Sequence, residues 1–352
     1  MLSRRLISQG FAARRHLVSH GKGARTMRRG SWRSVLKVVI ALTSTAVFLH
    51  LAIRGVDLGA LGQVIWRTNW AVLLVAAAVS LGTYSIRALR WKVILGPVKG
   101  VGFHSAFVAT VIGFMANNVL PLRVGEFVKA FVVVKRENLP MSSILATIVI
   151  ERVFDGMAVA MISLGVVFVP GVPLWIRQAA LGLLVGFVLL LVGLTVLALY
   201  KDRLLTRVSG WPGVQGELGR RVEEIAAGFS HGIVILRDVR SAIIVAMFSV
   251  GLWLAHAAVF YLILVSLDMR LPLYAALVVL VCTSVGVLLP SGPGYVGTFQ
   301  YFSMLALAPF TVPQEIALGY SLVAHAAQWA PVTALGLGYA WILGLGIREV
   351  TA

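Results

Sequence analysis

The chain has 352 residues, of which 59% are hydrophobic and 12% charged, and its mean hydropathy is +0.92. Soluble domains contain about 45–50% apolar and about 25% charged residues, so this composition excludes a soluble enzyme and a disordered chain, and the single cysteine, Cys282, excludes a disulfide scaffold. The formal net charge of +18 favours an anionic partner, either nucleic acid or lipid. We therefore expect an all-α, polytopic helical membrane protein.

The basic residues are concentrated at the N-terminus. Ten of the 31 lie in the first 37 positions, and no acidic residue precedes Asp57. This pattern is typical of a mitochondrial transit peptide, but also of a basic cytoplasmic tail or of a chain that truly begins at Met27. The leader is nearly free of aromatic residues and no nucleic-acid-binding module follows, so we expect no nucleic acid as partner. We assign residues 1–34 to a basic leader and 35–348 to one transmembrane domain.

Long apolar runs follow the leader, and a membrane-spanning helix needs about 20 such residues. We predict about six full spans, at residues 35–53, 70–88, 142–169, 179–200, 241–266 and 315–346. Pro331 predicts a kink, a tilt or a split in the last of them. Two further apolar stretches, 103–134 and 272–308, are interrupted near their middles.

The distribution of Lys and Arg orients these segments. Basic residues mark one side of the membrane as cytoplasmic, and they occur in the leader, at 87–99, at 135–136, in the 201–240 connection and at Arg348. The opposite connections carry only Arg54, Arg67, Arg177 and Arg270. The pattern is consistent only if each interrupted stretch returns to the side of the membrane from which it entered, and this arrangement places both termini in the cytoplasm.

Residues 217–237 predict an amphipathic helix on the inner membrane surface, or a solvated connector with an apolar face.

The two interruptions resemble each other, as Leu120-Pro121-x-x-x-Gly125 and Leu289-Pro290-x-x-x-Gly294, 169 positions apart. Oppositely oriented broken segments at matching positions are typical of an inverted-repeat transporter, with its site between them; the alternative is a pair of packing kinks. We therefore predict two oppositely oriented re-entrant helical hairpins. The expected hinge or gate residues are Pro121, Gly125, Pro290, Ser291, Pro293, Gly294, Tyr295 and Gly297.

Three charges lie inside the apolar run 142–169, namely Glu151, Arg152 and Asp155. Each ionised group costs about 2.5–3.5 kcal/mol at the centre of a bilayer, so these groups must pair or face a hydrated cavity. Arg123, Glu126 and Lys129 follow the first break at intervals of three.

The residues around that break suit an anionic ligand. Arg binds phosphate through a forked geometry and Lys as a point charge, and the N-terminus of the half-helix adds positive potential. We predict a binding site for an amphiphile with an anionic headgroup, and the alternative is a purely structural ion cluster. Its residues are Asn117, Asn118, Arg123, Glu126, Lys129, Glu151, Arg152 and Asp155.

Other polar residues carry weaker signals. Arg87, Arg90, Trp91 and Lys92 are interpreted as interface anchors at a cytoplasmic helix end. His256, His325 and Gln328 are interpreted as hydrogen-bonded packing residues. The chain shows no metal-ligand spacing, no Walker-type phosphate loop and no nucleophile elbow, so we expect no metal, no cofactor, no catalytic residue and no use of ATP.

Four segments in combination resemble the lysylphosphatidylglycerol synthase transmembrane (flippase-like) family. They are Arg87-Ala88-Leu89-Arg90-Trp91, Asn117-Asn118-x-Leu120-Pro121-x-Arg123-x-Gly125-Glu126, Glu151-Arg152-x-x-Asp155 and Leu289-Pro290-Ser291-x-Pro293-Gly294-Tyr295-x-Gly297-x-Phe299. The resemblance implies a plasma (inner) membrane protein that moves lipids or lipid-linked headgroups between leaflets. Full synthases carry a soluble aminoacyl-transferase domain after the membrane part, and we expect no synthase reaction here. Gln300 stands where many relatives carry an acidic residue.

Three functions are compatible with these observations. The first is a lipid flippase or scramblase for an anionic phospholipid or lipid-linked headgroup. The second is a membrane-embedded enzyme that modifies a lipid headgroup, with Glu126, Glu151 or Asp155 as general base. The third is a non-transporting subunit of envelope lipid or glycan assembly. The expected partners are anionic membrane lipids, with a second copy of the chain or an envelope-biosynthesis protein as further candidates.

Overall fold

The computed structural model describes residues 38–120, 123–169, 172–209 and 238–344, together with Leu36 and Ile235. These residues form helices and turns and contain no strand, which confirms the all-α prediction. The basic leader, Pro121, Arg348 and all of the predicted surface helix at 217–237 except Ile235 lie outside the described residues.

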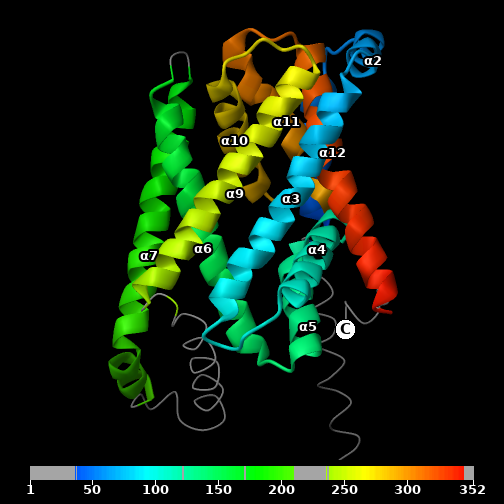
Figure 1. Ribbon diagram of the computed structural model, residues 1–352. Coiled ribbons are helices and arrows are strands. Elements are labelled where there is room, and N and C mark those ends of the chain that lie inside the picture. The colour runs from blue at the N-terminus through cyan, green and yellow to red at the C-terminus, as the bar shows by residue number, and fades with distance from the viewer. Residues whose placement is uncertain are drawn as a thin grey trace, which may run out of the picture.

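The helices follow one another closely along the chain (Figure 1). An N-terminal helix at Val38–Ile53 precedes α2 (Leu58–Trp66), α3 (Trp70–Leu95), α4 (Phe103–Val119), α5 (Gly125–Glu137), α6 (Met141–Val167) and α7 (Leu174–Ser209). The second half contains α9 (Val239–Ser266), α10 (Leu273–Leu288), the short η4 (Pro293–Tyr295), α11 (Thr298–Leu307), η5 (Ala308–Phe310) and α12 (Gln314–Ile342).

In the described residues, all six predicted spans are helical, although they differ in apolar character. In the described part of the chain, three segments are long and apolar enough to cross a membrane: α3, Leu174–Gly193 of α7, and α9. The N-terminal helix and α2, bent by 87°, would make a fourth span. With 27 and 29 residues, α6 and α12 are also long enough, but α6 carries three charges in its middle. One uninterrupted helix contains Pro331, so α12 is not split.

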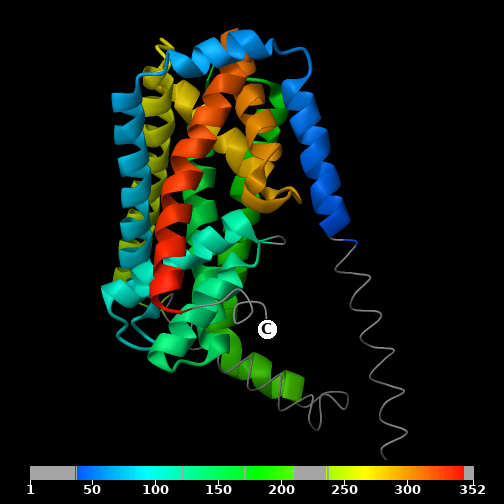
Figure 2. The ribbon, with the colours of Figure 1, turned by 90° about the vertical axis from the view of Figure 1, so that its right-hand side faces the viewer.

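Both interrupted stretches form helical hairpins. The first consists of α4 and α5 and the second of α10 and α11, and they enter the bundle from opposite ends and turn near its middle (Figures 1 and 2). With 17 and 16 residues, α4 and α10 are too short to cross a bilayer. The base of the first hairpin is closed by Lys99, whose ammonium donates to the Glu137 carbonyl oxygen at 2.8 Å.

The two hairpins belong to an inverted repeat. Shifting α3 by the 169 positions that separate the breaks gives residues 239–264, and α9 covers 239–266; the same shift takes α4 to 272–288, and α10 covers 273–288. In the same way α5 and α6 correspond to α11 and α12. The units α3–α6 and α9–α12 run in opposite directions along the bundle, with α7 between them in the chain (Figure 1).

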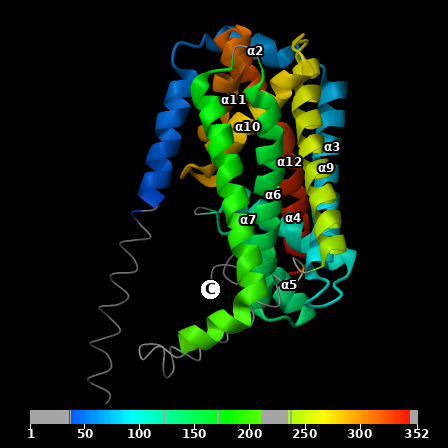
Figure 3. The ribbon, with the colours of Figure 1, turned by 90° about the vertical axis from the view of Figure 1, so that its left-hand side faces the viewer.

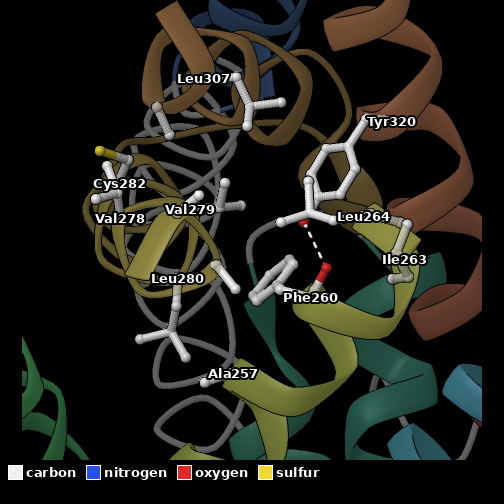
Figure 4. Close-up of a cluster of buried hydrophobic side chains, with 14 of the residues drawn as sticks. Ala257, Phe260, Ile263, Leu264, Val278, Val279, Leu280, Cys282, Leu307 and Tyr320 are labelled. Atoms are coloured by element: carbon white, nitrogen blue, oxygen red, sulfur yellow. Dashed lines mark hydrogen bonds between the residues drawn. The ribbon is translucent and has the colours of Figure 1, made fainter. Parts of the chain in front are cut away.

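Each repeat contributes most of the residues of one hydrophobic core. Trp91, Ile112 and Val133 belong to the core of the first repeat. Phe260 and Tyr320 belong to that of the second, in which the Tyr320 hydroxyl donates to the Phe260 carbonyl oxygen at 3.1 Å (Figure 4). The ion network described below lies among α3, α5 and α6 of the first repeat, and the cavity and the contact between the hairpin tips lie where the two units meet.

The legs of the first hairpin approach each other closely at two glycines. A Cβ on Gly125 would lie 2.1 Å from the Gly113 carbonyl oxygen, and a Cβ on Gly113 would lie 2.7 Å from the Lys129 Cβ. The side-chain oxygen of Asn117 accepts the Gly125 amide hydrogen at 2.8 Å and so caps the start of α5. Gly125 therefore has a packing role, and its predicted role as a hinge stays a prediction.

Substitution Gly125→Ala tests this close approach. The methyl group would overlap a backbone oxygen, so we expect a loss of about 1–3 kcal/mol of stability, measured as a lower thermal unfolding midpoint in detergent. The control is Gly82→Ala in α3, where nothing lies within 4 Å of a new Cβ and alanine should be neutral or slightly stabilising. Equal midpoints for the two variants would contradict the packing role.

Candidate functional site

A buried ion network lies at the centre of the first repeat. Glu151 and Asp155 of α6 are both bridged by Arg90 of α3, whose side chain is 0% exposed. Its Nη2 lies 2.9 Å from Glu151 Oε1, and its Nη1 lies 2.5 Å from Asp155 Oδ1 and donates to the Ser249 hydroxyl at 2.8 Å. The planar fork of a guanidinium suits this double contact.

Lys129 of α5 completes the pairing of Glu151. Its ammonium contacts Glu151 Oε2 and lies 3.9 Å from the centroid of the Trp91 ring. The Trp91 indole in turn donates to the Thr147 hydroxyl at 3.1 Å. Lys129 is therefore buried, and its ammonium is paired with Glu151 in this structure, so the phosphate contact expected of it stays a prediction.

The other side of Asp155 faces the second repeat. Arg87 lies 3.4 Å from Asp155 Oδ2, and the Trp253 indole donates to Oδ1 at 3.1 Å. Arg87 Nη2 also lies 3.1 Å from His256 Nε2; because a guanidinium only donates, the histidine nitrogen is the acceptor. Arg87 and His256 are 169 positions apart, so equivalent positions of the two repeats meet here.

Arg152 is the most accessible member of the ion network, with a side chain that is 40% exposed. It lies within 3.3 Å of Asp155, 3.5 Å of Glu151 and 3.7 Å of Glu126. Its Nε and Nη2 have no hydrogen-bond partner in the described residues. Both atoms are buried and lie within ion-pair distance of these carboxylates, so they belong to the ion network, whereas the exposed part of the Arg152 side chain lines the cavity described below.

The tips of the two hairpins touch through Arg123. Its Nη2 donates to the Leu289 carbonyl oxygen at 2.7 Å and to the Ser291 hydroxyl at 3.2 Å, and its guanidinium lies 4.7 Å from the centroid of the Tyr295 ring. Arg123 and Tyr295 have φ values of 54° and 62°. Left-handed backbone is costly for residues with a Cβ and is typical of clamps and switches.

Further contacts hold the second tip. The Thr45 hydroxyl oxygen accepts the Gly292 amide hydrogen at 2.8 Å, and the Gln300 side-chain oxygen accepts the Gly297 amide hydrogen at 2.7 Å. Gly294 and Gly297 have φ values of 66° and 86°, which glycine adopts readily. The amide of Asn118 donates to the Thr333 hydroxyl at 2.8 Å. Of the other predicted gate residues, Pro290 is exposed and Pro293 begins η4.

A cavity of about 490 Å³ lies between the repeats, beside the ion network. Its size is within the range of about 300–1,000 Å³ typical of ligand sites. One wall is polar, with Arg87, Arg152, Asp155, Trp253 and His256, and most of the remaining lining is apolar. The apolar residues include Leu183 and Phe187 of α7 and Leu288 at the end of α10, whose side chains are partly or largely exposed. The cavity is therefore open to the outside of the bundle at these residues. In Figure 3, α7 and α6 lie in front of α10.

The predicted site residues thus separate into three groups. Arg152 and Asp155 line the cavity. Glu126 pairs with Arg152, while Lys129 and Glu151 pair with each other. The other three lie in the first hairpin and bond elsewhere. Asn117 accepts from Gly125 within that hairpin, Asn118 donates to Thr333 of α12, and Arg123 donates to Leu289 at the tip of the second hairpin.

Arg87, Arg90 and Trp91 are not interface anchors, so that interpretation is wrong. They are 5%, 0% and 0% exposed, and both arginines pair with α6. Their spacing carried a signal, since residues three apart share a helix face and the acidic pair on α6 required basic partners.

With both arginines, the charged groups at the site comprise five basic and three acidic residues, a net charge of +2. The basic residues are Arg87, Arg90, Arg123, Lys129 and Arg152, and the acidic residues are Glu126, Glu151 and Asp155.

Within the described residues, no group of three or more His, Cys, Asp or Glu side chains could hold a metal ion. The positive excess at the site instead favours an anionic ligand.

Substitution Arg90→Gln tests the ion network. It leaves Glu151 and Asp155 short of a buried partner, so we expect a loss of about 3–5 kcal/mol, measured as a large fall in the thermal midpoint or in monodisperse yield. Adding Asp155→Asn should recover part of the loss. The control is Lys99→Gln, whose ion pair with Glu137 is 48% exposed on the lysine side and should cost less than about 1 kcal/mol. Equal stability of Arg90→Gln and Lys99→Gln would refute the central role of Arg90.

Comparisons with known proteins agree with this architecture. A family model of the lysylphosphatidylglycerol synthase TM region matches residues 34–336. The chain is 24% identical over 283 residues to a UPF0104 membrane protein of Methanothermobacter thermautotrophicus, covering 78% of this chain and 84% of that protein. It is 21% identical over 318 residues to UPF0104 membrane protein MJ1595 of Methanocaldococcus jannaschii, covering 86% and 94%.

A shorter match joins the chain to glycosyltransferase AglD of Haloferax volcanii, with 32% identity over 135 residues, or 38% of this chain and 21% of that protein. The family model spans most of the chain, including both hairpins and the ion network. The chain therefore belongs to the family of the lysylphosphatidylglycerol synthase TM region.

Proposed function

We propose that this multi-pass membrane protein is a flippase or scramblase that moves a lipid with an anionic headgroup between the two leaflets. Its family and its relatives, one of them a glycosyltransferase, support a function in membrane lipid or glycan metabolism. The finer assignment to transport rests on the site.

The observation that carries the proposal is the chemistry of the cavity. Its charged wall holds Arg87 and Arg152, whereas Leu183, Phe187 and Leu288 form an apolar side open towards the membrane. A lipid can enter sideways with its acyl chains in the apolar part and its phosphate at Arg152. The Arg152 side chain is 40% exposed and lines the cavity, and a guanidinium there suits a phosphate. Charged groups inside a membrane commonly mark a substrate pathway.

The hairpin tips supply the moving part. Arg123 holds them together through Leu289, Ser291 and Tyr295. A passing phosphate competes for the same guanidinium and loosens this contact. The left-handed backbone at Arg123 and Tyr295 stores about 1–3 kcal/mol at each position, which lowers the cost of opening. Lys129 acts as a positioning residue that holds Glu151.

A headgroup-modifying enzyme has less support. Glu151 and Asp155 accept contacts from several cationic side chains, so their oxygens are already occupied. The carboxylate of Glu126 is more accessible but faces Arg152. A subunit without transport activity would not need the cavity or the contact between the hairpins.

The sidedness in this proposal places both termini in the cytoplasm and the protein in the plasma membrane. Lys92, Lys99, Lys135 and Arg136 lie at the end of the bundle where α3 and α5 finish, whereas Arg67 and Arg270 lie at the other end. Basic residues favour the cytoplasmic side.

Reconstitution tests transport directly. Liposomes that contain the protein and fluorescent phosphatidylglycerol are treated with an impermeant quencher, so the inner-leaflet signal falls only if lipid is exchanged. We expect Arg152→Gln to slow this exchange by about 10- to 100-fold, the effect of a lost charge-assisted hydrogen bond. The control is Arg270→Gln, an arginine that is 90% exposed outside the site. Equal rates for the two variants, or turnover of the headgroup without exchange, would contradict the proposal.

A further inference from the structure

The contact between Arg87 and His256 joins a residue that is always charged to one that titrates. Arg87 Nη2 lies 3.1 Å from His256 Nε2, and the two residues are 169 positions apart, which is the shift that relates one repeat to the other. The second repeat thus carries histidine where the first carries arginine. Histidine is the side chain whose charge ordinarily changes between about pH 5 and 8, whereas arginine keeps its charge.

The geometry of this contact requires a neutral imidazole. A guanidinium has only donors, so His256 Nε2 must offer a free electron pair, and the ring hydrogen lies on Nδ1. A proton on Nε2 would remove the acceptor and place two cationic groups 3.1 Å apart. Protonation of His256 and its hydrogen bond to Arg87 therefore exclude each other.

The charged groups near His256 come from α3 and α6. Three of them line the same cavity, namely Arg87 of α3 and Arg152 and Asp155 of α6. The buried Arg90 and Glu151 of these helices pair with each other at 2.9 Å. Arg87, which touches the imidazole nitrogen directly, is therefore the group that a proton on His256 must displace.

The other helices around the cavity add no charge beside His256. Among the described residues, the parts of the lining that belong to α7, α10, α11 and α12 are uncharged. The titratable residues of α10 are Tyr274 and Cys282, and neither lines the cavity. In α12, Tyr320 and His325 are hydrogen-bonded to other partners. The charge state of His256 is thus determined by Arg87 and by whatever occupies the cavity.

An anion in the cavity removes the conflict between Arg87 and a proton. An anion that binds Arg87 takes the donor away from His256 and frees Nε2. Arg87 still lies 3.4 Å from Asp155, and its guanidinium carbon lies 4.9 Å from the centroid of the Phe114 ring, so it keeps two partners. The two arginines and one aspartate of the lining carry a net charge of +1, which an anion and a proton together leave unchanged.

We propose that His256 is a proton-binding site that takes up one proton when an anion enters the cavity and releases it when the anion leaves. The proton comes from solvent, which reaches the partly exposed His256 through the open cavity, and the Arg87 hydrogen bond moves from the imidazole to the anion. By linkage, the proton and the anion strengthen each other's binding by the same factor. The use of this coupling in transport rests on the proposed function, in which a proton gradient then drives lipid movement without ATP.

Lipid binding at two pH values tests the coupling. The full-length protein in detergent is titrated with short-chain phosphatidylglycerol, whose phosphate diester carries one negative charge at both pH 6 and pH 8, and the affinity is measured by microscale thermophoresis. We expect wild type to bind about tenfold more tightly at pH 6 than at pH 8, a factor within the usual range for two coupled sites.

A variant and a matched control assign this pH dependence to one histidine. His256→Gln keeps a side-chain oxygen that accepts from Arg87 but does not titrate, so its affinity should be equal at the two pH values. The control is His104→Gln, an exposed histidine of α4 outside the cavity lining, which should keep the wild-type pH dependence.

The fluorescence of Trp253 reports protonation at the site itself. The centroids of the Trp253 and His256 rings are 5.5 Å apart, and an imidazolium quenches an indole more strongly than a neutral imidazole does. With phosphatidylglycerol bound, a change from pH 8 to pH 6 should quench the wild-type protein. The quenching should disappear in His256→Gln, and in Trp253→Phe because the reporter is gone.

The outcomes separate this inference from the proposed function. Equal binding by wild type at the two pH values would overturn the inference and leave transport intact, as would pH dependence or quenching that persists in His256→Gln. Absence of phosphatidylglycerol binding at both pH values would overturn the proposed function as well.

Discussion

The double ion pair of Arg90 is the interaction on which the rest of the structure depends. Two carboxylates inside an apolar bundle are tolerated only if cationic groups reach them, and the fully buried Arg90 joins Glu151 to Asp155. This requirement brings α3, α5 and α6 together around one point. Without the ion pairs of Arg90, the charged side chains beside the cavity would lack their partners, because most of the surrounding lining is apolar.

The charge distribution makes an otherwise symmetrical architecture asymmetrical. The repeats correspond helix by helix, but the positions in α12 that match Glu151, Arg152 and Asp155 are Tyr320, Ser321 and Ala324. The first repeat thus supplies the charges, whereas the second supplies His256, Gln328 and the glycine-rich tip. The cavity and the Arg123 contact lie where the two units meet, which is where an inverted-repeat transporter keeps its site.

The sequence predicted the architecture well because the bilayer restricts it strongly. Apolar length located the six spans, and the two Leu-Pro breaks together with the basic residues located both hairpins. The prediction ended the second span at residue 88, whereas α3 continues to Leu95. Arg87 and Arg90 therefore lie inside a helix and not at a membrane interface. The cavity lining could not be predicted, because it depends on how two repeats with weak mutual similarity pack.

The central claim is that a lipid occupies the cavity with its phosphate at Arg152. A cryo-EM structure of the protein in nanodiscs of phosphatidylglycerol tests it most directly. The account predicts headgroup density within hydrogen-bond distance of the Arg152 guanidinium, and acyl-chain density leaving the bundle past Leu183, Phe187 and Leu288. A well-resolved cavity that holds only water, with ordered lipid confined to the outer surface, would contradict it.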